Sequence, residues 1–210
     1  MLTAFFLHSF RHFQRITHAE GDALGKHQGD ELGTALGLAA KGDQAAFALI
    51  VEEHQAMVFS IAFHYLRDRS LAEDVAQEVF LELYQKLTTI QSLPHLTFWL
   101  RRVAVHRSID QGRKLNHRRE QELDSIGEPA AARAGSDPLL HDQLRQSLQA
   151  LPEKQRMVVV LRYQEDMGPG EIAEVMEMPV NTVKSTLHRT LEELRKKLTR
   201  KIGEARYAFF

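Results

Sequence analysis

The stretch from Gly170 to Leu198 constrains the fold of this chain more than any other. An apolar stripe over Ile172–Met176 predicts a short first helix. The segment ending in Pro179 stops that helix, because proline has no N–H to donate and restricts the residue before it. A longer helix is expected from Val180, with an apolar stripe that packs inward: Val183, Leu187, Leu191, Leu194 and Leu198. A short helix, a tight turn and a longer helix are typical of a helix-turn-helix.

The first turns of the second helix carry polar and cationic side chains at helical spacing. They are Asn181, Lys184, Ser185, His188 and Arg189. In a helix-turn-helix this helix lies in the DNA major groove, where lysine and arginine suit guanine and asparagine suits adenine. An ordinary helical hairpin would only solvate this face. Residues 181–201 nevertheless hold seven lysines and arginines against two glutamates, a balance of +5 in a chain of net charge −1, which favours DNA binding.

The composition limits the classes of function. No cysteine is present among the 210 residues, which excludes disulfides and thiol chemistry and fits a cytoplasmic protein. A protein that holds DNA alone is usually basic, so the near-neutral total indicates a second partner. No phosphate-binding loop, HExxH motif or nucleophile elbow occurs, so we predict no enzyme activity, no catalytic residue and no cofactor.

Residues 1–38 are expected to be an extension that is disordered or partly helical. The glycine and charge content favours disorder from His18 to Gly37. The apolar run Ala4–Leu7 is too short to span a membrane, so no membrane insertion is expected. His8 and His12 have a spacing that could bind a metal, but no carboxylate or cysteine lies at ligand spacing, so a solvated helix is favoured and no metal site is predicted.

Two helices are predicted between Ala39 and Leu87. The first begins after Asp43 as N-cap and has one broad apolar face, on which His54 is expected to be a packing residue. The second follows a turn at residues 67–70, with Ser70 and Glu73 as a capping box. Its buried stripe is Val75, Val79, Leu83 and Leu87, and its other side shows Asp74, Gln77, Glu78 and Glu82. An acidic face of this kind is usually solvated, and it is too regular for a paired-carboxylate active site.

Residues 88–119 are strongly basic. Seven cations, Arg101, Arg102, Arg107, Arg113, Lys114, Arg118 and Arg119, face one acid, Asp110, in a balance of +6. Aromatic residues lie among them, and that combination suits a surface that stacks bases and neutralises phosphates. The Trp99 ring itself is expected to be a core anchor.

Residues 120–138 hold glycine and proline without an apolar stripe, which predicts a flexible linker. Fully extended, it would reach roughly 60 Å, close to two turns of DNA. Further helices are expected over 139–150 and 152–163. We therefore predict an all-α protein with two small helical domains, 39–119 and 139–202, joined by a flexible linker; the second contains the helix-turn-helix, and 203–210 is a tail.

Four segments in this order, KGDQAAF, AEDVAQEVFLELYQKL, FWLRRVAVHRSID and the long stretch from LPEKQRM to LRKKL, make the chain recognisable. From about Ala39 to Leu198 it resembles the extracytoplasmic-function (ECF) sigma factors of bacterial RNA polymerase, in the sigma-70 family. The resemblance implies a non-catalytic subunit that binds core RNA polymerase and promoter DNA, recognises the −35 and −10 elements and helps to melt the DNA. An anti-sigma factor is a further candidate partner. The alternative is a stand-alone helix-turn-helix transcriptional regulator.

The resemblance also assigns roles to residues. It implies that the acidic face, Asp74, Gln77, Glu78 and Glu82, docks on the clamp helices of the largest polymerase subunit. It implies −10 recognition and melting by the basic helix and the loop Gln91–Thr97 before it, through His95, Trp99, Arg101, Arg102, His106, Asp110, Arg113 and Lys114. His106 stands where the family commonly has asparagine. Reading of −35 falls to Asn181, Lys184, Ser185, His188 and Arg189.

Overall fold

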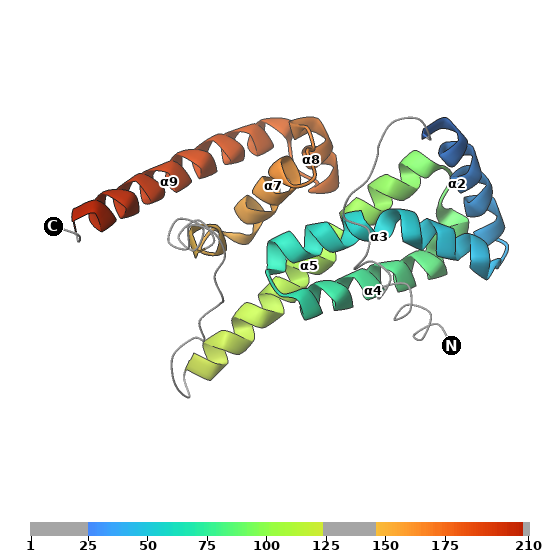
Figure 1. Ribbon diagram of the computed structural model, residues 1–210, viewed down its shortest axis with the longest axis horizontal. Helices are drawn as coiled ribbons and strands as arrows, with labels where there is room; N and C mark the ends of the chain where they lie inside the picture. Colours follow the sequence, from blue (N-terminus) through green and yellow to red (C-terminus); the bar gives the residue numbers. More distant parts are fainter. Residues whose placement is uncertain (1–24, 124–145, 208–210) are drawn as a thin grey trace.

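The computed structural model describes residues 25–123 and 146–207, and these form helices and turns with no strand (Figure 1). The all-α prediction is confirmed. The first group of helices is α2 (Gly25–Ala39), α3 (Gln44–Leu66), α4 (Arg69–Lys86), the short 3-10 helix η2 (Leu87–Thr89) and α5 (Leu93–Leu123). The second group is α7 (Glu153–Tyr163), α8 (Pro169–Val175) and α9 (Val180–Tyr207).

Helix α3 is the centre of the first group and contacts α2, α4 and α5. Asp43 caps it as predicted, because its side chain accepts from the N–H groups of Ala45 and Ala46 at 2.9 and 3.1 Å. Its predicted apolar face is buried, including Ile50, Val58, Ile61 and Tyr65. By length and composition α3 could cross a membrane, and it is the one such helix in the described part of the chain. Its apolar character is that of a core helix, since half of the relevant window is buried.

The start of α4 differs from the prediction. Asp68, not Ser70, is the N-cap, and its carboxylate accepts the Leu71 N–H at 3.0 Å. The predicted capping box is therefore wrong, because the carboxylate of Asp68 lies one helical turn before the N–H that needs an acceptor. Glu73 instead pairs with Arg69 at 2.8 Å. The stripe Val75, Val79, Leu83 and Leu87 is buried as predicted.

The extension before residue 39 is helical where the structure describes it. Ala35, Leu36 and Ala39 of α2 are buried against the first group, and α2 contacts α3. The disorder predicted from His18 to Gly37 is therefore wrong from Gly25 onward, because an apolar stripe at i, i+1 and i+4 outweighs the glycine content. Residues 1–24, with His8 and His12, lie outside the described residues.

Helix α5 is longer than predicted at both ends. It begins at Leu93, so most of the predicted loop Gln91–Thr97 is helical. It ends at Leu123, so the first residues of the predicted linker, 120–123, are helical too. Residues 124–145, which hold the rest of the linker and the start of the helix predicted over 139–150, lie outside the described residues; 146–149 are helical.

The second group contains the predicted helix-turn-helix, formed by α8 and α9. Val183 and Leu194 are buried as predicted, whereas Leu191 is 40% exposed, so its inward packing was predicted wrongly. The stripe turns away from the core there because 3.6 residues per turn do not match an even three- and four-residue spacing over a long helix. Helix α9 continues to Tyr207, into the predicted tail.

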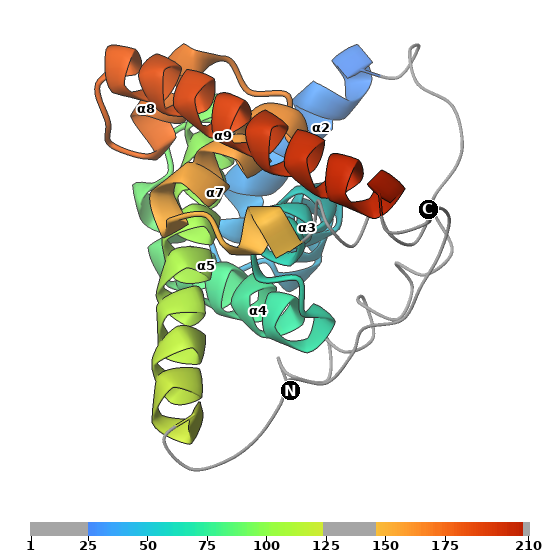
Figure 2. The same ribbon diagram turned by 90° about the vertical axis from the view of Figure 1, so that its left-hand side faces the viewer.

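The two groups lie against each other (Figures 1 and 2). Helix α7 contacts α3 and α5, and α8 contacts α5. The buried apolar cluster continues from one group into the other, with Met157, Leu161, Met167 and Ile172 on the second side.

Candidate nucleic-acid and partner surfaces

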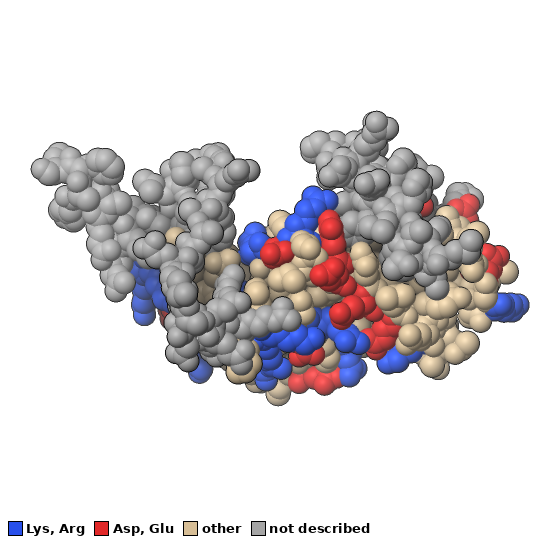
Figure 3. Space-filling model, turned by 90° about the horizontal axis from the view of Figure 1, so that it is seen from below, with Lys and Arg blue, Asp and Glu red and all other residues tan. Residues whose placement is uncertain are grey.

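The acidic residues predicted on one face of the second helix lie together on α4. Asp74 and Glu78 are exposed, while Gln77 and Glu82 are half-buried. The space-filling view shows acidic side chains gathered in a band on the side where α4 lies, with basic side chains beside it (Figure 3). The opposite face of α4 holds the buried stripe, so the fold itself fixes the outward direction of these acids.

Arg107 of α5 neutralises part of this acidic face. Its guanidinium donates to the Glu82 carboxylate at 2.8 Å and lies 3.6 Å from that of Glu78. Lys86 donates to the other oxygen of Glu82 at 2.9 Å. These hydrogen bonds, that of Arg107 first, hold the pKa of Glu82 below its ordinary value. Asp74 and Glu78 are therefore the more available charges for a basic partner.

The first turn of α5 is held by its own side chains. The ring Nδ1 of His95 accepts the Gln91 N–H at 3.2 Å, and Ser92 Oγ accepts the His95 N–H at 3.3 Å. This reciprocal arrangement is that of a capping box, with histidine in the place of the usual glutamate. His95, predicted to contact DNA, is thus half-buried and occupied in shaping the turn.

A buried histidine fixes the same turn from behind. His54 Nδ1 lies 2.9 Å from the Ile50 carbonyl oxygen, and its Nε2 lies 3.4 Å from Thr97 Oγ1. His54 is 8% exposed, so its predicted role as a packing residue is consistent with its place in the core. Sequence reasoning missed Thr97 as its partner, because the two residues lie 43 positions apart and no local pattern joins them.

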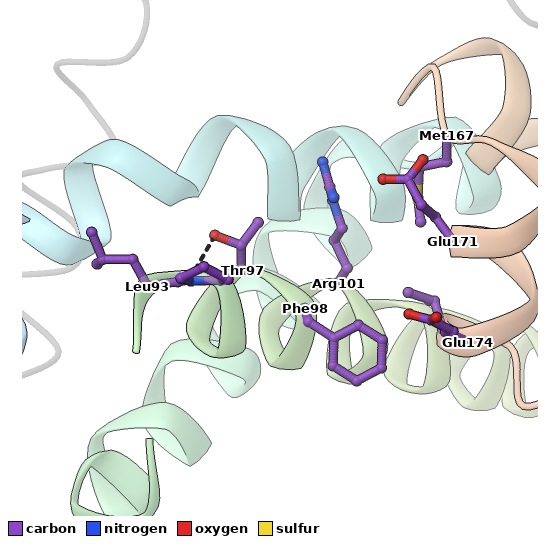
Figure 4. Close-up of a pocket in the computed structure, with 9 residues that line it drawn as sticks. Leu93, Thr97, Phe98, Arg101, Met167, Glu171 and Glu174 are labelled. Carbon is purple, nitrogen blue, oxygen red and sulfur yellow. Dashed lines mark hydrogen bonds between the residues drawn. The ribbon is translucent and has the colours of Figure 1, made fainter. Parts of the chain in front are cut away.

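The cations predicted for the −10 surface divide between two directions. Trp99, Arg102, His106 and Arg113 follow a spacing that places them along one side of α5; Arg102, His106 and Arg113 are exposed, as are Asp110 and Lys114. Trp99 is half-buried, and the Lys86 ammonium lies 5.9 Å from its ring centroid. Arg101 instead points into a pocket between the helix groups (Figure 4).

Two of these arginines contact the second group of helices. Arg102 forms an ion pair with Glu177, in the turn between α8 and α9. Arg113 Nε donates to Glu153 Oε2 at 2.7 Å, at the start of α7, and also lies 3.5 Å from Asp110. These pairs join residues far apart in the sequence, so no spacing argument could find them.

The pocket that receives Arg101 has a volume of about 490 Å³. One wall comes from the start of α5, with Leu93, Thr97 and Phe98, and the other from α8 and the turn before it, with Met167, Glu171 and Glu174 (Figure 4). Arg101 Nε is buried without a hydrogen-bond partner. The pocket thus combines one cation with two carboxylates at the contact between the two groups.

The predicted recognition surface lies on the first turns of α9. Asn181, Lys184, His188 and Arg189 are exposed and Ser185 is half-buried. Ser185 Oγ donates to the Thr182 carbonyl at 3.0 Å, which occupies its hydroxyl proton within the helix. Val183 and Thr190 are fully buried beneath this face, so the packing of α9 on α7 and α8 determines which side chains face outward.

The described residues contain no group of three or more histidine, aspartate or glutamate side chains arranged to hold a metal ion. The charged surfaces are therefore suited to binding polymers and protein faces through hydrogen bonds and charge.

Comparison with known proteins agrees with this division into two helical groups. The family model "Sigma-70 region 2" matches residues 50–119, and "Sigma-70, region 4" matches residues 141–194. The ECF RNA polymerase sigma factor SigW of Bacillus subtilis is 31% identical over 171 residues, covering 75% of this chain and 91% of the relative. The ECF RNA polymerase sigma-E factor of Escherichia coli is 32% identical over 171 residues, with 75% and 89% covered.

Solved structures share the fold at lower identity. CnrH, in complex with the cytosolic domain of CnrY, superposes with a TM-score of 0.59 at 22% identity, covering 81% of this chain and 99% of that one. The sigma factor RpoE of Bartonella quintana, in complex with the anti-sigma factor NepR, also gives 0.59, at 19% identity with 73% and 96% covered. Because region 2 and region 4 match in order, and relatives at about a third identity are covered almost completely, the chain belongs to the ECF sigma factors of the sigma-70 family.

Proposed function

We propose that this sigma factor binds core RNA polymerase through the acidic face of α4 and directs initiation at promoters whose −10 and −35 elements are bound by α5 and α9. In this proposal residues 39–119 are the region 2-like domain and 139–202 the region 4-like domain. The protein acts by binding and carries no catalytic group of its own, and its place is the cytoplasm, with the polymerase.

The observation that carries the proposal is the separation of charge among three helices of one small chain. Asp74 and Glu78 project from α4, Arg102 and Arg113 from α5, and Lys184 and Arg189 from α9. An acidic face fits a basic protein partner, whereas the two basic faces fit DNA phosphates and base edges. A stand-alone helix-turn-helix regulator would leave the first two surfaces without a ligand.

We assign the first turn of α5 to base capture. A base extruded from the duplex loses its stacking unless a pocket replaces it. The turn at Gln91–Thr97 is held by His95 and by His54, which gives the rigid support that such a pocket needs. An anti-sigma factor remains a candidate partner, because solved structures that share this fold contain one.

The test is transcription in vitro with purified core polymerase, the purified chain and DNA from upstream of its own gene. Transcripts with a defined start that require both proteins are the expected result. Binding of the chain to duplex promoter DNA without any binding to polymerase would contradict the proposal and support the stand-alone regulator. Co-elution with core polymerase gives an independent readout of the α4 contact.

A further inference from the structure

The second domain lies against the side of α5 that the proposed function assigns to promoter DNA. Glu177 pairs with Arg102, and Glu153 pairs with Arg113 at 2.7 Å. Carboxylates and phosphates engage the arginine guanidinium through the same N–H groups. In this closed arrangement the two glutamates therefore occupy the donors that a DNA backbone would need.

The contact includes buried groups as well as charges. Met167 is 2% exposed, and the Arg156 guanidinium lies 5.1 Å from the ring centroid of Tyr65 on α3. Glu165 has its pKa raised, first because it is buried at this contact, where it also hydrogen-bonds Ser60. A carboxyl group that loses water on closing would not be found in a contact made by exposed side chains alone.

The closed arrangement covers one predicted surface and leaves two open. Lys184 and Arg189 of α9 remain exposed, and so do Asp74 and Glu78 of α4. The chain can thus meet polymerase and a −35 element while the cations of α5 are still engaged by its own second domain.

We propose that the second domain is an intramolecular partner of the −10 surface, with Glu153 and Glu177 as a latch that polymerase or promoter DNA releases. The identity of the displaced DNA rests on the proposed function, whereas the latch itself does not. Arg102 and Glu177 are 45% and 52% exposed, so this pair is individually weak. A covalent tether compensates through effective concentration, which gives a contact that forms in the isolated chain and opens readily.

The first experiment measures closure without DNA. Because the chain has no cysteine, Ser70→Cys on α4 and Thr199→Cys on α9, both exposed, can carry a donor and an acceptor dye. Glu177→Arg is expected to lower the transfer efficiency, and adding Arg102→Glu to it is expected to restore the efficiency by reversing the pair.

The matched control is Glu193→Arg. Glu193 belongs to the same domain but pairs with Lys197 within α9 at 2.6 Å, so this variant changes the net charge equally and should leave the transfer efficiency unchanged. Equal transfer in the wild type and Glu177→Arg, or no recovery in the charge-reversed pair, would overturn the latch whatever the transcription result.

The second experiment measures the affinity of the isolated chain for a fluorescent −10 single strand. If the open state is populated at about 10%, full opening raises the apparent affinity about ten-fold. We expect this gain for Glu177→Arg and not for Glu193→Arg. Closure with correct charge-swap behaviour but no gain in DNA affinity would reject −10 DNA as the displaced ligand, while leaving the transcription test to judge the proposed function.

Discussion

At the scale of single residues, Glu177 combines a strained backbone with an exposed contact. Its φ of 52° lies in the left-handed region, where the N–H of Met178 bonds the Ala173 carbonyl at 2.9 Å to close α8. Glycine is the usual residue at this position of a helix end. A glutamate retained there keeps the carboxylate that meets Arg102, at a cost in backbone conformation.

Glu177→Gly should raise the free energy of unfolding by about 1 kcal/mol in high salt, where the ion pair is screened. Urea unfolding followed by circular dichroism measures this. The control is Glu174→Gly, one turn earlier in the helical part of α8, which should lower the free energy by about 1 kcal/mol. A decrease for both variants would show that the turn at Glu177 is not strained.

Glu165 gives a pH dependence of known sign. Its folded-state pKa is raised, first by burial, so the folded protein binds the proton more tightly than the unfolded chain. Its stabilising effect is present at low pH and is lost as pH rises from the unfolded value through the folded one. Glu165→Gln should therefore be more stable than the wild type at neutral pH, with the difference shrinking on acidification. Thermal unfolding at several pH values tests this, and a difference that grows on acidification would contradict it.

At the scale of elements, α4 and α9 carry the predicted binding surfaces. Charge reversal of Asp74 and Glu78 to lysine should abolish co-elution with core polymerase while helix content stays unchanged, because both side chains are exposed on α4. Glu31→Lys with Glu52→Lys, exposed acids of α2 and α3, is the matched control. Normal polymerase binding by the α4 variant would remove the docking role from this face.

On α9, Lys184→Ala with Arg189→Ala should weaken −35 binding, with about 1–3 kcal/mol for each lost base contact. The salt dependence of binding should become shallower if a phosphate contact is also lost. Arg195→Ala with Lys196→Ala, exposed later on the same helix, removes the same charge and should preserve promoter choice. Titration of duplexes with altered −35 sequences separates the two pairs.

Local patterns predicted these elements well and their long-range contacts poorly. The stripes of α3 and α4 and the helix-turn-helix follow from spacing and proline, so they were predicted. The helical state of α2 was missed, because only packing on α3 stabilises its short apolar stripe. Arg107 was counted with the DNA-facing cations, yet it lies against Glu82, 25 positions away. The pairing of Arg102 with Glu177 depends on how two domains meet, which no local period encodes.

At the scale of the whole molecule, Tyr65 lies where α3, α5 and α7 meet. It is 1% exposed, and burial raises its pKa to about 12. The folded protein therefore keeps a proton that the unfolded chain loses above its ordinary value, so stability should fall as pH rises from about 10 to about 12. Tyr65→Phe should remove this fall, whereas Tyr163→Phe, at an exposed site, should keep it. Denaturant unfolding at alkaline pH provides the measurement.

Gly112 lies beside that tyrosine, in the middle of α5. A Cβ at this position would lie 2.9 Å from Tyr65 Cε1, closer than real side chains approach. The absence of one methyl group thus sets how closely α5 lies on α3, and so the height at which the neighbouring Arg113 is held. Substitution at residue 112 would therefore tune promoter opening by geometry, so that the responsiveness of the regulator could drift during evolution while every charged residue stays in place.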